Sequence, residues 1–351
     1  MSIELDFSKK LKGFVLRAKL SAGDERIGIL GASGSGKSMT LKCVAGVETP
    51  DEGTIVIDGV TVFDSARRID VRPQRRKAGF LFQNYALFPT MTVAENIGIA
   101  ARGKGGRERE SLVRDAIRRM GLEGLERSMP SRLSGGQQQR TALARILASE
   151  PAILMLDEPL SALDSHLRSS VERELADFMG RFAGTTLFVS HDRDELYRAC
   201  DRIAVLDGGE LIGARDKREL FANPLTVTAA RLSGCKNLAR AVRVGDKRIY
   251  VPDWNLALET ASEVEREVAW VGVHGHHIRG AVRGEKVNCF EFNVDRRDSA
   301  PFSVSEYITA TREAPGITRP LCRDYPIGVD EPEVNERVYC LPPEKLLLLR
   351  E

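Results

Sequence analysis

The sequence predicts an α/β protein with two domains, a parallel-sheet domain followed by a small domain of β-strands. Continuous apolar runs, such as residues 153–156, are typical of strands buried in a parallel sheet. A glycine-rich loop stands between one such run and a helical segment. After residue 235 the pattern changes to short alternating strands separated by Gly, Pro and Asp. We therefore expect one domain over residues 1–232 and a second over residues 235–351, a length that allows two cores.

The glycine-rich loop has the pattern G-x-x-x-x-G-K-[ST] and reads Gly31-Ala32-Ser33-Gly34-Ser35-Gly36-Lys37-Ser38. Its glycines allow successive backbone N–H groups to surround an anion, and the following helix adds its positive dipole end. Lys37 would bring a cation to the outer phosphates, and Ser38 would offer a hydroxyl to Mg²⁺. A chance match in a turn is the alternative, but the strand-like run before the loop and the helix-like run after it argue against chance. The expected ligand is a nucleoside triphosphate with magnesium.

Polar side chains follow three apolar strands of this domain. Asp157 and Glu158 end the run that begins at Ile153, Gln83 follows a run from Ala78, and His191 follows a run from Thr186. Ligands of open α/β sheets bind at the carboxyl edge of the strands, so we expect Asp157 to hold Mg²⁺ through water and Glu158 to polarise the attacking water. His191 is expected to contact the γ-phosphate, although a lone His is more often a surface or capping residue.

A second helix start carries glycines. Ser134 and Gln137 have the spacing of a capping box, and they enclose Gly135 and Gly136 at the start of a helix that continues through Leu147. This start is either a second anion site or an ordinary N-cap with flexible glycines, and cap statistics do not separate the two interpretations.

Four other segments are informative, and three of them have two interpretations. Residues 3–20 alternate as antiparallel strands do, and Phe14 in this segment is either core or a stacking partner for adenine. Basic residues cluster over residues 67–77 and form either a phosphate patch or a solvated face. The bulky apolar side chains of residues 87–93 suggest a docking surface as readily as core. Residues 107–127 form a charged amphipathic helix without any nucleic-acid feature.

Composition limits the class of protein. The chain has 52 Lys and Arg against 50 Asp and Glu, and this net charge of +2 suggests neither nucleic-acid nor anionic-membrane binding. No run approaches the roughly 20 apolar residues of a membrane span, and the start lacks the features of a signal peptide, so we expect a soluble cytoplasmic chain. The cysteines are scattered without a C-x-x-C pair, and reduced thiols are expected at all six positions, Cys43, Cys200, Cys235, Cys289, Cys322 and Cys340.

Taken in this order, these motifs and the segment Ser161–Asp164 resemble the ATP-binding subunit of ABC transporters over roughly residues 1–232, and Leu133–Gln137 is the most specific of them. The resemblance implies a P-loop ATPase domain with a helical subdomain that binds ATP and Mg²⁺ and hydrolyses ATP. It implies that Gln83 joins Mg²⁺ and senses the membrane partner, that Ser134–Gln137 contact the γ-phosphate bound to the other subunit, and that Asp164 lies at the dimer interface. The expected partners are a second copy, an integral membrane permease at whose cytoplasmic face the chain lies, and indirectly a substrate-binding protein.

Within that family the sequence resembles the importers, and most closely those for molybdate, in residues 3–7, 75–83, 87–89 and 342–349. The implied cargo is a small oxyanion, molybdate or tungstate, with sulfate or another substrate as the alternative. A soluble ABC-type ATPase acting on DNA or ribosomes is a rival, which the near-neutral charge and the β domain disfavour. A third hypothesis is that the chain is an oxyanion storage or sensing protein.

The C-terminal domain resembles a regulatory or oxyanion-binding appendage of these importers. Residues 296–336 match no pattern that we identify, and His274 and His276 stand where the resemblance leads us to expect Arg.

Overall fold

The computed structural model describes residues 1–101, 103–161, 165–282, 284–311, 319–328 and 337–351. The chain divides into two compact units, Met1–Lys217 and Arg218–Glu351. This division lies upstream of the expected end of the first domain at residue 232, because the helix α8 (Val227–Leu232) packs on a hydrophobic cluster of the second unit that includes Cys235, Leu347 and Leu349.

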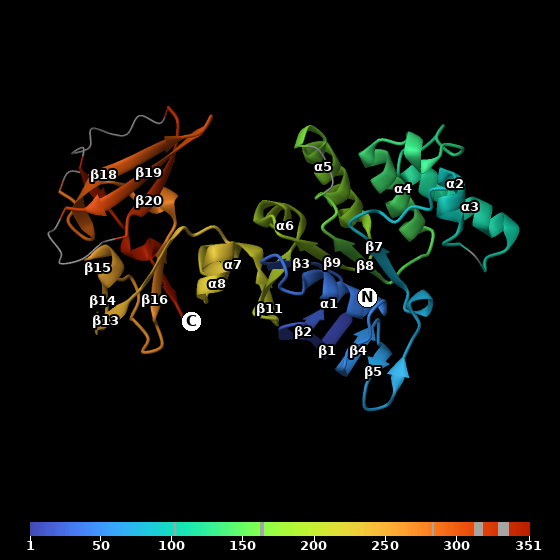
Figure 1. The fold of residues 1–351 in the computed structure, drawn as a ribbon, viewed down its shortest axis with the longest axis horizontal. Helices are drawn as coiled ribbons and strands as arrows, with labels where there is room; N and C mark the ends of the chain where they lie inside the picture. The colour runs from blue at the N-terminus through green and yellow to red at the C-terminus, as the bar shows by residue number, and fades with distance from the viewer. Residues whose placement is uncertain (102, 162–164, 283, 312–318, 329–336) are drawn as a thin grey trace. The chain divides into compact units, whose positions relative to one another are not determined.

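The first unit is organised around an 11-stranded mixed sheet in the order β6-β5-β4-β1-β2-β11-β10-β3-β9-β8-β7 (Figure 1). Its parallel part consists of β7 (Ala78–Leu81), β8 (Ile153–Asp157), β9 (Thr185–Ser190), β3 (Arg26–Gly31) and β10 (Arg202–Asp207). Every residue of β8 and β9 is buried, as expected for strands covered on both faces. The predicted parallel sheet is confirmed.

The other strands of this sheet pair antiparallel, except that β11 also pairs with β2 in parallel. They are β1 (Ile3–Leu11), β2 (Phe14–Ala22), β4 (Glu52–Ile57), β5 (Val60–Asp64), β6 (Ile69–Asp70) and β11 (Glu210–Asp216). β1 alternates buried and exposed positions along Ile3, Leu5 and Phe7, which is the pattern of a strand with one covered face. The antiparallel interpretation of residues 3–20 is therefore confirmed.

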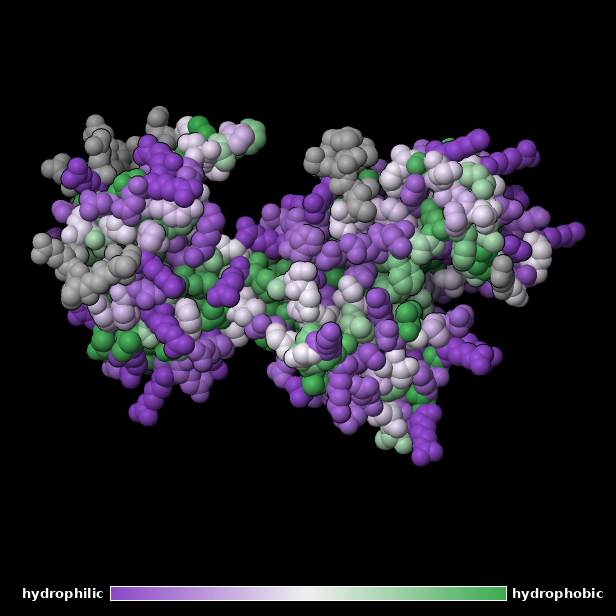
Figure 2. Space-filling model, viewed as in Figure 1, coloured by the Kyte–Doolittle hydropathy of each residue, from purple (hydrophilic) through white to green (hydrophobic). Residues whose placement is uncertain are grey.

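Of three helices near the sheet, α1 (Lys37–Ala45) and α6 (Arg193–Ala199) contact its parallel strands, and α5 (Ser165–Arg181) contacts α6. Three others, α2 (Val93–Gly98), α3 (Gly106–Arg119) and α4 (Gly135–Leu147), share a separate apolar cluster around Ile97, Leu122 and Ala144 and form a helical subdomain (Figure 1). Hydrophilic side chains project from the region of α3 (Figure 2), as the amphipathic pattern predicts, but the helix ends at Arg119 and not at residue 127 as expected. Within the described residues, no helix combines the length and apolar character that crossing a membrane requires.

One member of the basic cluster is not on a solvated face. The side chain of Arg76 is 0% exposed. Its guanidinium donates to the carbonyl oxygens of Cys43 at 2.9 Å and Val44 at 3.0 Å, at the C-terminal end of α1, and pairs with Asp70 at 2.8 Å. Gly46, the C-cap residue of α1, lies against this side chain. Arg76 therefore caps the C-terminal end of α1, the helix that follows the glycine-rich loop. A cation at this end also interacts favourably with the helix dipole.

The second unit begins with the short helices α7 (Lys217–Ala222) and α8, and its strands form sheets of three, three and five strands. One three-stranded sheet consists of β12 (Asn237–Arg240), β16 (Trp270–Val273) and β22 (Leu347–Leu349). The other consists of β13 (Val242–Gly245), β14 (Arg248–Val251) and β15 (Leu256–Glu259). The five-stranded sheet has the order β17 (Arg279–Gly280), β21 (Val338–Cys340), β18 (Cys289–Ser299), β19 (Ser303–Ala310) and β20 (Leu321–Pro326). Single 3₁₀ turns precede or follow several strands, at Pro252–Trp254, Gly275–His277 and Pro343–Lys345. The expected C-terminal β region is confirmed.

Two features of this unit differ from the sequence analysis. Residues 296–336, which match no sequence pattern, include the end of β18 and all of β19 and β20. A buried carboxylate, Glu306, holds these strands together through Arg297 and Arg323. The expectation of reduced thiols is wrong for Cys289 and Cys340, which form a disulfide because antiparallel pairing places them opposite each other.

Candidate nucleotide-binding site

The glycine-rich loop leaves β3 and enters α1 at the carboxyl edge of the parallel strands. Gly31 cannot carry a side chain, because a Cβ there would lie 2.7 Å from Ser35 Oγ and 2.8 Å from the Leu206 carbonyl oxygen. Gly36, the N-cap of α1, has φ 109° and provides no side-chain cap. No side chain among the described residues therefore caps the first turn of α1, and its N–H groups face the loop with the positive end of the helix dipole.

The polar groups of the loop fit an anionic ligand. Lys37 is 5% exposed, and its ammonium donates to the carbonyl oxygens of Gly31 at 2.8 Å and Ala32 at 2.9 Å. Burial lowers the pKa of Lys37, against the opposing effect of two nearby carboxylates. Ser35 Oγ is buried without a hydrogen-bond partner. The buried ammonium of Lys37 thus has only backbone carbonyl partners, and the hydroxyl of Ser35 next to it has no partner. A phosphate group would accept hydrogen bonds from both.

Asp157 ends β8 next to the start of α1. Ser38 Oγ donates a hydrogen bond of 2.7 Å to Asp157 Oδ1. Asp157 is 6% exposed, and burial raises its pKa even though it accepts the Ser38 hydroxyl. Two hard oxygen donors at hydrogen-bond distance, one of them a carboxylate that is poorly solvated, fit the ligand preference of Mg²⁺.

Glu158 and His191 lie together one residue beyond the ends of β8 and β9. Glu158 N donates to the Val189 carbonyl oxygen at 3.0 Å, and Glu158 Oε1 lies 3.4 Å from His191 Nδ1. Glu158 has φ 44°, an uncommon conformation for a residue with a side chain, and the turn after it is held by Ser161 Oγ, which donates to the Glu158 carbonyl oxygen at 2.8 Å. The structure therefore brings these two predicted site residues together.

Gln83 is connected to the same turn. Its Nε2 donates to Ser161 Oγ at 3.2 Å, so Gln83 reaches the carboxylate strand end through one hydroxyl group. The segment after Gln83 is fixed by the helical subdomain: Arg145 donates to the carbonyl oxygens of Tyr85 and Ala86, at 2.9 and 2.7 Å. Tyr85 and Ala86 both have positive φ, and the Tyr85 hydroxyl lies 3.5 Å from the Pro159 carbonyl oxygen. This loop thus connects the helical subdomain to the carboxylates.

A network of polar side chains around the turn that carries His191 was not predicted from the sequence. Ser190 Oγ donates to Glu195 Oε2 at 2.6 Å, and Arg168 pairs with Glu195 and, at 3.3 Å, with Asp192. Asp192 caps α6 by accepting from the backbone N–H groups of its first turn. The network fixes the turn that carries His191. The Asp192 and Glu195 spacing, which resembles a capping box, is the sequence signal that could have indicated it.

The second helix start has the predicted capping box. Ser134 Oγ accepts from Gln137 N at 3.3 Å, and Ser134 N donates to Gln137 Oε1 at 2.9 Å. No hydrogen bond or ion pair in the described part of the chain joins Ser134, Gly135, Gly136 or Gln137 to the glycine-rich loop. Asp164 lies outside the described residues.

This chain is similar in sequence to known proteins. Residues 16–161 match the family model for the ABC transporter. The chain is 37% identical over 222 residues to a molybdenum import ATP-binding protein of Paramagnetospirillum magneticum, covering 63% of this chain and 61% of that protein. It is 39% identical over 219 residues to a spermidine/putrescine import ATP-binding protein of Thermotoga maritima, covering 62% of this chain and 58% of that protein. The chain thus spans about three fifths of the length of these curated relatives.

Two similar solved structures are covered almost over their full length by this chain. A dimeric bacterial ABC transporter cassette aligns with a TM-score of 0.51 and 30% identity, over 62% of this chain and 99% of that chain. The dimeric post-hydrolysis state of an ATP-binding cassette, bound to ADP and Pi, aligns with the same TM-score and 29% identity. With the loop, the two carboxylates and the capped helix start in place, the chain has the ABC ATPase fold and belongs to the ABC transporter family.

Proposed function

We propose that the chain binds and hydrolyses ATP as one of two identical subunits and thereby powers import through a separate membrane permease. The observation that carries the proposal is the convergence of Ser38, Asp157, Glu158 and His191 at one edge of the sheet, with hydrogen-bond or ion-pair distances of 2.7 and 3.4 Å. The names of the relatives, which are import ATP-binding proteins, support the transport role.

Each side chain has a proposed task. Lys37 would exchange its bonds to the loop carbonyls for bonds to the outer phosphates, which are stronger because both partners are charged. Mg²⁺, held by Ser38, Gln83 and Asp157, would neutralise charge on the phosphates. Glu158 would orient the attacking water and accept its proton, and His191, already beside Glu158, would contact the γ-phosphate.

The dimer completes the site in this proposal. Ser134, Gly135, Gly136 and Gln137 of one subunit would close over the γ-phosphate bound to the other, and Asp164 would lie at the interface. The dimeric state of the similar solved cassettes supports this arrangement. Two anion-binding helix starts in one chain are useful together if each ATP is held between two copies.

The proposed cargo is a small oxyanion, molybdate or tungstate, delivered by a substrate-binding protein. Relatives of similar identity are named for molybdenum, sulfate/thiosulfate, spermidine/putrescine and Fe(3+) ions. The cargo assignment therefore rests on the molybdate-like segments of the sequence. Cargo delivery can raise ATP turnover only if it stabilises the closed ATP dimer more than the open one.

Reconstitution tests both levels of the proposal. The chain is assembled in lipid vesicles with the permease and binding protein encoded beside it, and ATP hydrolysis is measured with molybdate, tungstate, sulfate, phosphate or spermidine. Stimulation by molybdate and tungstate is expected. Stimulation by sulfate or spermidine alone would contradict the cargo and retain the importer, whereas unstimulated hydrolysis without permease association would contradict the importer itself.

A further inference from the structure

The disulfide of the second unit joins two neighbouring strands of the five-stranded sheet. Cys289 begins β18, Cys340 ends β21, and the two residues are directly opposite in the antiparallel register. Leu341 N donates to the Asn288 carbonyl oxygen at 3.0 Å, so Cys289 and Cys340 form a non-hydrogen-bonded pair, in which opposite side chains are closest. The two sulfur atoms are bonded and close a loop with a sequence separation of 51 residues.

The two sulfur atoms differ in access. Cys340 is 0% exposed, whereas Cys289 is half-buried. An incoming thiolate therefore reaches Cys289 Sγ first, which makes Cys340 the leaving group. The direction of attack in thiol exchange is set by this difference in burial.

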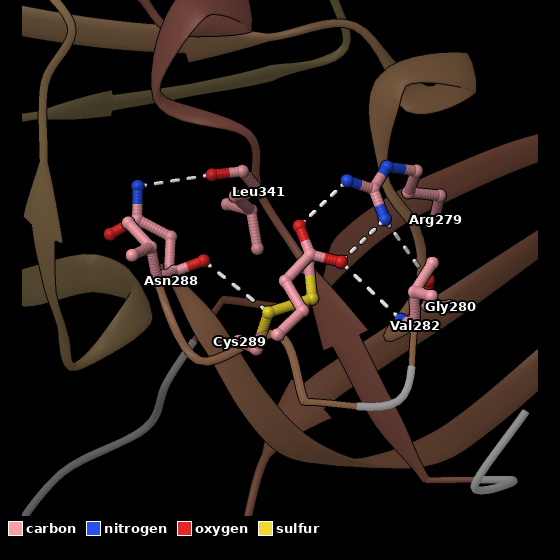
Figure 3. Close-up of a disulfide and its surroundings, with 9 residues drawn as sticks. Arg279, Gly280, Val282, Asn288, Cys289 and Leu341 are labelled. Carbon is pink, nitrogen blue, oxygen red and sulfur yellow. Dashed lines mark hydrogen bonds and ion pairs between the residues drawn. A yellow bond between two sulfur atoms is a disulfide. The ribbon is translucent and has the colours of Figure 1, made fainter.

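A carboxylate is placed beside both sulfur atoms. An oxygen of Glu285 and the two sulfur atoms all lie within 4.8 Å of one another. Arg279 holds Glu285 with two contacts of 2.7 Å and lowers the pKa of this carboxyl, which is therefore ionised (Figure 3). A negative charge here disfavours a thiolate, so a released sulfur atom is expected to take up a proton.

The four other cysteines do not share this chemistry. Cys43, Cys200, Cys235 and Cys322 are free thiols and all are buried. Burial raises the pKa of Cys43 to about 12 and that of Cys235 to about 12, and it also raises the pKa of Cys200 and Cys322. Since the thiolate is the reactive form, these four thiols are poor partners for exchange.

We propose that Cys289 and Cys340 form a thiol–disulfide exchange site for low-molecular-weight thiols of the glutathione class. One thiolate attacks Cys289 Sγ, the bond between the two sulfur atoms breaks, and its electron pair passes to Cys340 Sγ, which takes a proton. A second thiolate attacks the small thiol's sulfur in the mixed disulfide. The products are the small disulfide and Cys289 as a protonated thiol, so two electrons and two protons enter the chain, and the reverse sequence restores the bond.

Reduction would loosen a short strand. Among the described residues, β21 pairs with β18 at three positions, Cys289 to Cys340, Phe290 to Tyr339 and Glu291 to Val338, and with β17 at Arg279 and Gly280. The disulfide is one covalent member of this small ladder. Without it, the amides of Phe292 and Leu341, which donate across β18 and β21, are expected to exchange with solvent more rapidly.

The test uses the full chain in glutathione buffers of increasing reduced fraction, with EDTA present because the Glu285 oxygen and the two sulfur atoms are close enough to hold a metal ion. Differential alkylation with mass spectrometry identifies the reacting sulfur atoms, and hydrogen exchange follows the peptides around residues 288–292 and 337–341. We expect reduction at Cys289 and Cys340 only, with amide exchange there roughly tenfold faster.

Three variants sharpen the test. Cys289→Ser with Cys340→Ser should exchange like the reduced protein in every buffer, while Cys322→Ser should respond like the unchanged chain. Glu285→Gln should accelerate reduction, since it removes the charge that opposes the leaving thiolate. A bond that persists in fully reduced buffer, a pair that never oxidises, or reduction without a change in amide exchange would each overturn the proposal.

Discussion

The starts of α1 and α4 are both rich in Gly and Ser, yet their backbone N–H groups have different partners. α1 begins after Gly36 without a side-chain cap, while α4 begins after Ser134 with a complete capping box. At the C-terminal end of α1, Arg76 donates hydrogen bonds to the last carbonyl groups. The α1 start therefore offers its backbone N–H groups to a ligand. At the α4 start, the capping box already bonds some of the N–H groups of the first turn.

This difference shows that glycines at a helix start do not by themselves make a phosphate site. The α4 start retains one useful group, because Ser134 Oγ accepts from Gln137 N and its own O–H can still donate. We infer that α1 supplies the primary binding site and that α4 contributes when a second subunit brings it to the same phosphate. The following predictions test this division, beginning with the largest effect.

Glu158→Gln should bind ATP and lose hydrolysis by roughly 10²- to 10⁴-fold, the usual contribution of a general base. The uncleaved nucleotide should trap a dimer in which the α1 start of one subunit and the α4 start of the other share the γ-phosphate. Phosphate release and size-exclusion chromatography with Mg-ATP measure the two effects. Loss of hydrolysis with only monomers would show that α4 does not act in the partner's site.

Lys37→Ala should weaken ATP binding by about 2 to 5 kcal/mol, which is roughly 30- to 5,000-fold, because it removes the cation next to the phosphates. Titration with a fluorescent ATP analogue measures this change. Lys19→Ala, an exposed surface lysine paired with Asp6, is the matched control and should leave the affinity unchanged. Equal affinity of both variants would exclude the α1 start as the binding site.

Arg76→Met should lower the free energy of unfolding by about 3 kcal/mol, since it leaves two carbonyl groups at the end of α1 without their donor and Asp70 without its cationic partner. Urea unfolding of the isolated variant measures this loss. Arg75→Met, at an exposed neighbouring position, should change stability by less than about 0.5 kcal/mol. A similar loss in both variants would contradict the role of Arg76 at the end of the helix.

Ser134→Ala should cost about 1 kcal/mol of stability, as the loss of an N-cap does. Thr92→Ala is its control, because Thr92 and Glu95 form the same capping box at α2. The two variants should unfold alike, but only Ser134→Ala should reduce hydrolysis. Ser134→Asp should keep the cap and still prevent the ATP-dependent dimer, since a carboxylate would oppose the γ-phosphate; full hydrolysis by this variant would exclude the α4 start from the site.

The smallest predicted effect concerns Asp157 without ligand. Burial raises its pKa above the unfolded value of 3.8, so the folded chain is penalised for the ionised form at neutral pH. Asp157→Asn should therefore be slightly more stable than the unchanged protein at pH 7, and this advantage should disappear as the pH falls through the raised pKa. Thermal unfolding from pH 7 to pH 4 measures it; a constant difference would contradict the assignment.

The sequence predicts local features well, because their patterns are short. The glycine-rich loop, the buried strand that ends at Asp157 and the capping box at Ser134 each follow from a few adjacent residues. The bonds of Arg76 and the disulfide of Cys289 join distant segments, and no local pattern reports such contacts. The strands between residues 296 and 336 were missed because charged residues such as Arg297 and Glu306 interrupt the apolar alternation and pair with each other instead.

The contact between Arg76 and the end of α1 restricts which substitutions the chain can accept together. Gly46 has φ 76°, and a Cβ at this position would lie 2.4 Å from Arg76 Nε. A side chain at residue 46 is therefore incompatible with arginine at residue 76, and loss of the arginine removes the steric reason for glycine without removing the left-handed conformation. The effects of substitutions at the two positions should therefore be strongly non-additive. The loss in free energy of unfolding on replacing both residues should be well below the sum of the losses for the two single variants.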